Sequence, residues 1–242
     1  MRCGLFILWL LCSGDGWAQT FDQVVNGDTS NANPSTLTIN VPSNSNRVMY
    51  IFHAMQGTTN SCTTSSADFN GSAATKIGEV GSSTNAGADY AYASMWRLIA
   101  PATGSHTVTA NISSCTFDGY TRIIAFSIYN VNQTTPEGTC ATTSATTGTS
   151  SSINVTSASG DLVIDGLSAT GAPTTTAGGS QTDQSAGLNR IDGSTLTASG
   201  ASTTMSWSIS GGTFGHAQIG CAVKPVTSAN HGTTLATERL HQ

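Results

Sequence analysis

Short stretches in which apolar residues alternate with Ser, Thr or Asn recur along this sequence. Met205, Trp207 and Ile209 alternate with hydroxyl residues, and 36–41 and 107–112 repeat the pattern. A period of two places the apolar side chains on one face of a strand, whereas a helix needs apolar spacings of three and four. No stretch combines a sustained 3.6-residue period with helix caps. The sequence therefore predicts an all-β fold.

Two further runs, 47–54 and 122–129, are apolar at nearly every position and predict central strands buried on both faces. The runs follow one another closely and are separated by Gly, Asn, Ser and Pro, which is typical of many short strands joined by turns. We therefore expect a single antiparallel β-sandwich. The Ser/Thr/Gly-rich segments 140–152 and 171–187 predict long loops, and no internal repeat of fixed period is visible.

The composition excludes several classes of protein. Only 9% of the chain is charged, with 8 Lys and Arg, while 32 Ser and 38 Thr are present among 242 residues. A protein that binds nucleic acid by neutralising phosphates needs many more cations, so we predict no nucleic-acid partner. The low content of charged residues also excludes coiled coils, helical bundles and charged disordered tails. Low charge with abundant Thr, Ser and Gly is typical of extracellular β proteins.

The first residues have the features of an export signal. Arg2 precedes an apolar run at 5–11, and small residues at Gly16 and Ala18 favour cleavage after Ala18. A lipid anchor on Cys12 is the alternative, but a large residue stands directly before that cysteine. We expect a signal peptide at 1–18, a β-sandwich domain at 19–225 and a polar tail at 226–242. No later segment is long and apolar enough to cross a membrane, so the protein is predicted to be secreted and extracellular.

Four cysteines would remain after that cleavage: Cys62, Cys115, Cys140 and Cys221. An even number in an oxidising compartment predicts two disulfides, for which three connectivities exist. Cys62 and Cys115 both lie in Ser/Thr-flanked, loop-like stretches, so we pair them with each other and Cys140 with Cys221. The spacing shows no CxxC pair and no Cys/His cluster, which disfavours a zinc site.

A series of short signposts occurs in a recognisable order. They are Phe69-Asn70-Gly71, Trp96 with Pro101 and Gly104, Val131 to Pro136, Gly160-Asp161-Leu162-Val163, and Trp207 before Ala222-Val223-Lys224-Pro225. In this order the chain resembles a widespread group of secreted bacterial β-sandwich modules of cell-surface and extracellular proteins, over roughly 34–225. The resemblance implies a jelly-roll-like sandwich, often attached to adhesive proteins. It implies no catalytic residue.

Sugar binding is the function that the residues favour most. Carbohydrate sites combine an aromatic face with amide and hydroxyl groups and tolerate low charge. By strand parity, Tyr90, Tyr92 and Trp96 share a face and could form a stacking platform, although core packing is favoured for Trp96. Further candidate ligand-binding residues are Phe117, Tyr120, Arg97 and Asp118.

The sequence marks no catalytic constellation. It contains neither a Gly-x-Ser-x-Gly elbow nor the carboxylate pattern of a sandwich glycosidase, so we predict no catalytic residues and favour a protein that is not an enzyme. No cofactor is expected. A structural Ca²⁺ is a candidate at Asp68 and Asn70, and ordinary Asx-turn chemistry is the alternative for the same residues.

We therefore expect a secreted, non-catalytic β-sandwich protein that binds a glycan or a cell-surface polymer, as an adhesion-type protein does. The first alternative is a self-assembling extracellular filament subunit, in which segment 19–33 adds as a strand to a neighbouring subunit. The second alternative is a secreted hydrolase that acts on polysaccharide through an unrecognised site.

Overall fold

The computed structural model describes residues 18–28, 33–57, 62–82, 90–113, 119–185 and 190–226. The described residues form strands and turns only, as the alternating sequence predicts. The first nine strands are β1 (Thr20–Asp28), β2 (Ser35–Val41), β3 (Val48–Gly57), β4 (Thr64–Phe69), β5 (Ser72–Ala73), β6 (Thr75–Gly81), β7 (Tyr90–Ile99), β8 (Gly104–Ile112) and β9 (Tyr120–Tyr129). The next eight are β10 (Ala141–Ala145), β11 (Ser150–Thr156), β12 (Leu162–Ala169), β13 (Thr174–Ala177), β14 (Thr182–Asp183), β15 (Ile191–Thr197), β16 (Ser202–Ser210) and β17 (His216–Val223).

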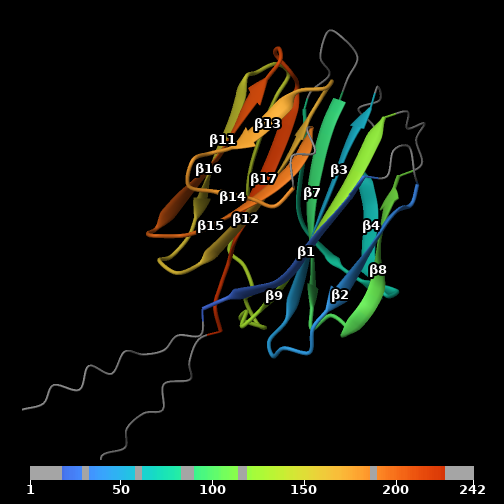
Figure 1. Ribbon diagram of the computed structural model, residues 1–242, viewed down its shortest axis with the longest axis vertical. Coiled ribbons are helices and arrows are strands. Elements are labelled where there is room, and N and C mark those ends of the chain that lie inside the picture. Colours follow the sequence, from blue (N-terminus) through green and yellow to red (C-terminus); the bar gives the residue numbers. More distant parts are fainter. Residues whose placement is uncertain are drawn as a thin grey trace, which may run out of the picture.

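These strands form four antiparallel sheets, two in each half of the chain (Figure 1). In the N half, the inner N sheet has the order β1-β9-β3-β7-β6 and the outer N sheet β2-β8-β4-β5. In the C half, the inner C sheet has the order β10-β17-β12-β15-β14 and the outer C sheet β11-β16-β13. One sandwich has two sheets, so the expectation of a single sandwich is not confirmed.

The buried clusters give the order of the layers. One cluster lies between the two inner sheets and includes Phe52 and Phe126 of the inner N sheet and Ile164 and Ile219 of the inner C sheet. A second cluster joins the inner and outer N sheets, and two more join the inner and outer C sheets. The inner sheets are thus covered on both faces, which explains why all ten residues of β3 are buried.

Two paired glycines allow the inner sheets to approach closely. Gly166 on β12 lies opposite Gly193 on β15. A Cβ built on Gly166 would lie 2.4 Å from a ring carbon of Phe52, and one on Gly193 would lie 3.1 Å from Ile124. These positions therefore hold glycine because aromatic and aliphatic side chains of the facing sheet occupy the space of a side chain.

The two halves repeat one strand order. The two inner sheets match position by position: the order β1-β9-β3-β7-β6 in the N half corresponds to β10-β17-β12-β15-β14 in the C half. The outer sheets match in the same way, β2-β8-β4 corresponding to β11-β16-β13. The register agrees as well: His53 of β3 pairs with Ser94, and Asp165 of β12 pairs with Ser194. All four side chains are buried. The structure thus contains an internal repeat that the sequence does not display.

The predicted long loops are wrong in part. Segment 140–152 contains β10 and the first residues of β11, and segment 171–187 contains β13 and β14. All four strands lie at sheet edges, and all except β11, whose alternate residues are buried, bury few side chains. Because Ser and Thr can fill such positions, the strands lack the apolar alternation that would have marked them.

The disulfide prediction is confirmed for one pair. Cys140, which directly precedes β10, is bonded to Cys221 of β17, with Cα atoms 4.3 Å apart. Cys62 is also disulfide-bonded. Its predicted partner, Cys115, lies outside the described residues. Within the ranges that the structure describes, no helix could span a bilayer.

Segment 19–33, considered above for strand addition to a neighbour, contains β1. This strand pairs antiparallel with β9 of its own chain and forms one edge of the inner N sheet. It also contacts the C half, because Gln19 Nε2 donates to Val223 O at 2.7 Å and Asn26 Nδ2 donates to Gln184 O at 3.2 Å. β1 therefore lies along the junction of the two halves.

Candidate functional site

The three aromatic residues on β7 lie on one side of the strand, as their parity predicts. Tyr92 and Trp96 are buried, with exposed fractions of 2% and 5%, and Tyr90 is half-buried. The Tyr92 hydroxyl bonds to Glu79, and Trp96 Nε1 donates to Ser94 Oγ at 3.1 Å. The rings of Tyr92 and Trp96 thus pack inside the N half.

The remaining predicted ligand-binding residues do not join this group. Tyr120 is 42% exposed at the start of β9, and the guanidinium of Arg190 lies 4.2 Å from the centre of its ring. Arg97 points to the opposite side of β7 and pairs with Glu137. Phe117 and Asp118 lie outside the described residues.

The proposed Ca²⁺ ligands lie at the turn between β4 and β5. Asp68 Oδ1 accepts a hydrogen bond from Gly71 N at 3.1 Å, and Asn70 has a φ of 52°. Both features are those of an Asx-type turn. Among the described residues, no three His, Cys, Asp or Glu side chains gather as metal ligands would.

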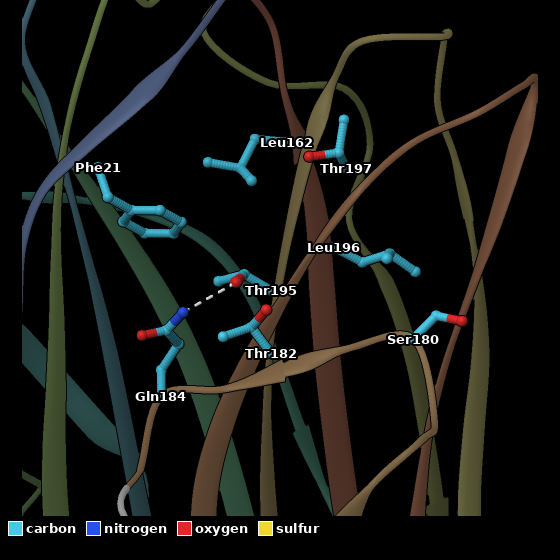
Figure 2. A pocket seen from close by; sticks show the side chains of 8 residues that line it. All are labelled: Phe21, Leu162, Ser180, Thr182, Gln184, Thr195, Leu196 and Thr197. Atoms are coloured by element: carbon cyan, nitrogen blue, oxygen red, sulfur yellow. Dashed lines mark hydrogen bonds between the residues drawn. The ribbon is translucent and has the colours of Figure 1, made fainter.

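An open groove lies where the inner N sheet ends over the inner C sheet. Its volume is about 430 Å³, and Figure 2 shows the side chains that surround it. The lining residues are Phe21, Leu162, Ser180, Thr182, Gln184, Thr195, Leu196 and Thr197. β1 contributes the one aromatic ring, and β12, β14, β15 and their connections contribute the rest.

The topology explains why this groove is open and polar. The inner C sheet continues through β15 to the short edge strand β14, and the inner N sheet ends at β1. The half-buried ring of Phe21 packs against Phe126, with ring centres 6.3 Å apart, and forms an apolar wall. Beyond it, Thr182 and Thr197 are exposed, and Gln184 Nε2 donates to Thr195 Oγ1 at 3.0 Å (Figure 2).

The groove presents neutral polar chemistry. Its lining supplies hydroxyls and one amide, which both donate and accept hydrogen bonds, beside an aromatic and an aliphatic surface. None of the eight lining side chains titrates. The groove can therefore hold an uncharged ligand that has polar edges and apolar faces, and its own residues supply no general acid, base or charged nucleophile.

Two titratable groups with large pKa shifts, Asp165 and His53, are buried away from the groove, one in each half. In the C half, Asp165 accepts hydrogen bonds from Ser194 Oγ at 2.5 Å, Gln218 Nε2 at 2.7 Å and Trp207 Nε1 at 2.8 Å. Burial raises the pKa of Asp165 to about 6, although these bonds oppose the shift. Because Asp165 is fully buried, this network specifies the core rather than a ligand site.

The N half has His53 at the corresponding position. Its Nδ1 lies 2.7 Å from Thr64 Oγ1, and its Nε2 lies 3.2 Å from Ser35 Oγ. Burial lowers the pKa of His53 to about 3, so the ring is neutral in the folded protein. Asp165 and Ser194 are the corresponding pair in the C half, so each half holds buried polar groups at the same place in the strand register.

No signal in the sequence marked the groove. Phe21 and Thr197 lie near opposite ends of the folded chain and meet only because the halves pack face to face. Comparison with protein-family models, with curated protein sequences and with solved structures finds no match to this chain.

Proposed function

We propose that the protein is a secreted, non-catalytic binding protein that takes a saccharide into the groove between β1 and the β14–β15 edge. The observation that carries this proposal is the lining of the groove. It combines the ring of Phe21 with several hydroxyls and the Gln184 amide and contains no charged side chain. Sugars offer apolar C–H faces to an aromatic ring and hydroxyls to amide and hydroxyl partners.

We also propose that each half is a jelly-roll-like sandwich. The eight strands of the C half occupy two sheets, and its first and last strands, β10 and β17, are neighbours. This arrangement supports the topology that the resemblance to secreted bacterial modules implies. Export would bring the groove into contact with extracellular or cell-surface glycans, and the Cys140–Cys221 disulfide is consistent with an oxidising compartment.

A glycan array of neutral and acidic oligosaccharides, followed by calorimetric titration of the hits, tests the proposal. We expect Phe21→Ala to weaken binding by tenfold or more, since stacking and anchoring contacts each contribute about 1–2 kcal/mol. Thr195→Val keeps the side-chain shape and removes the hydroxyl, so it tests the polar contacts without disturbing β1.

Tyr120→Ala is the matched control, because Tyr120 is an exposed aromatic residue that does not line the groove. If Tyr120→Ala abolishes binding while both groove variants still bind, the site lies at the position predicted from the sequence instead. The absence of any hit on the array would refute saccharide binding.

A further inference from the structure

The internal repeat gives the groove a counterpart in the N half. Tyr50 of β3 pairs with Arg97 of β7, and in the same register Leu162 of β12 pairs with Thr197 of β15. Leu162 and Thr197 line the groove. Tyr50 and Arg97 therefore mark the place in the N half that corresponds to the groove floor.

That counterpart holds a carboxylate. Arg97 Nη1 lies 2.5 Å from Glu137 Oε1, and the Tyr50 hydroxyl donates to Glu137 Oε2 at 2.9 Å. Glu137 belongs to the segment that enters β10, and its side chain is 8% exposed. The chain's own acid thus occupies this position, held by one guanidinium and one phenol. Burial and the neighbouring carboxylate raise the pKa of Tyr50, which keeps it a hydrogen-bond donor.

The groove lacks both of these partners. Thr197 stands where the N half has Arg97, and Leu162 stands where it has Tyr50. The other lining residues add no cation. A carboxylate placed here would lose part of its hydration without gaining a charged partner, which is unfavourable. An alcohol group at the same place needs only the hydroxyl and amide partners that the groove supplies.

We propose that the groove selects uncharged saccharides over acidic ones, and that Thr197 is the residue that sets this selectivity. This inference rests on the proposed function, because it concerns the ligand of the same groove. The N half shows what recognition of a carboxylate requires in this fold, and the C half lacks it. Removing an ionised carboxylate from water without a charged partner costs more than removing a hydroxyl that finds hydrogen-bond partners, so an acidic sugar should bind at least about tenfold more weakly than its neutral analogue.

The test uses matched oligosaccharides that differ only in oxidation at C6: galactose and galacturonic acid, mannose and mannuronic acid, glucose and glucuronic acid. Binding of each pair to the intact protein is measured by calorimetry at neutral pH and low salt. We expect wild type to bind a neutral member and to bind its acidic partner at least about tenfold more weakly.

Thr197→Arg introduces the N-half cation at an exposed strand end, where it should fold normally. This variant should bind the acidic member at least about tenfold more tightly than wild type does, and the gain should shrink as sodium chloride is added. Thr197→Gln is the matched control: it lengthens the side chain without charge and should bring no such gain.

The outcomes separate the two claims. If wild type binds no saccharide, neither on the array nor among these pairs, the proposed function fails and the selectivity fails with it. If wild type binds both members of a pair equally well, saccharide binding stands and the selectivity is refuted. If Thr197→Arg melts at the wild-type temperature but gains no affinity for the acidic member, or if Thr197→Gln gains as much, the role assigned to Thr197 is refuted.

Discussion

Gly166→Ala tests the face-to-face packing of the two inner sheets. The added Cβ would lie 2.4–2.5 Å from three ring carbons of Phe52, a side chain with no exposed surface. Overpacking of this kind costs typically 1–3 kcal/mol. A Gly→Ala change at a compatible site would instead stabilise by about 0.4–1 kcal/mol. We expect a net loss of about 2 kcal/mol, equivalent to a fall in melting temperature of roughly 4–8 °C for a chain of this size.

A second substitution distinguishes this contact from a general effect of alanine. Phe52→Leu removes the ring that the new methyl group would meet, and alone it costs about 1–2 kcal/mol as a core truncation. We measure the free energy of unfolding in urea by tryptophan fluorescence. We expect the loss in the double variant to be smaller than the sum of the two single losses by about 1 kcal/mol or more. Gly179→Ala is the control, because a Cβ there meets nothing within 4 Å. Additive losses, or an equal loss in the control, would show that the sheets do not pack as described.

Three further predictions concern the buried polar groups and the disulfide. Asp165→Leu should cost about 3 kcal/mol or more, because three donors lose their acceptor; in Asp165→Asn the loss should be smaller, since the amide oxygen still accepts two bonds. The pKa of Asp165 is raised in the folded protein. Its contribution to the free energy of unfolding is therefore full below pH 4 and is lost as pH rises through about 6. Urea titrations should therefore show wild type gaining on Asp165→Asn as pH falls from 7 to 4, and a constant difference would contradict the raised pKa. The pKa of His53 is lowered to about 3 in the folded protein. Its contribution to the free energy of unfolding is therefore present above pH 6.5 and falls by up to about 1.4 kcal/mol per pH unit below that pH. His53→Gln should flatten this part of the stability curve, and an unchanged slope would count against a buried neutral ring. Replacing Cys140 and Cys221 by Ser should lower the free energy of unfolding by about 2–5 kcal/mol, and no loss under oxidising conditions would show that the bond is dispensable.

Apolar periodicity was sufficient to predict the central strands but not the edge strands. β16 shows the expected alternation of buried and exposed residues, because each of its faces has a constant environment. β13 is a short edge strand with one buried position, so its Thr-rich sequence could not be told from a loop. Its place is determined by pairing with β16, which is a long-range interaction.

The internal repeat escaped sequence comparison because the halves share environments rather than residues. Equivalent buried positions hold His53 with Ser94 in one half and Asp165 with Ser194 in the other. A polar group of either kind satisfies the interior once it has hydrogen-bond partners, so the amino acid is free to change while burial and pairing stay the same. Such a repeat can be recognised only when strand order and register are known.

The groove follows from this repeat together with one difference between the halves. Each inner sheet ends in a two-strand extension, β7 and β6 in the N half and β15 and β14 in the C half. In the N half, the extension is covered by the segment from Glu137 to Cys140, which is held by the ion pair with Arg97 and by the disulfide. In the C half, the equivalent extension carries Thr182, Thr195 and Thr197, and β1 borders it with Phe21 and with the hydrogen bond from Asn26 Nδ2 to Gln184 O. The hydroxyl-rich surface of the C half is therefore open, whereas the corresponding surface of the N half is covered by the chain itself. This makes the uncovered copy the place where a ligand can take the position that Glu137 has in the first.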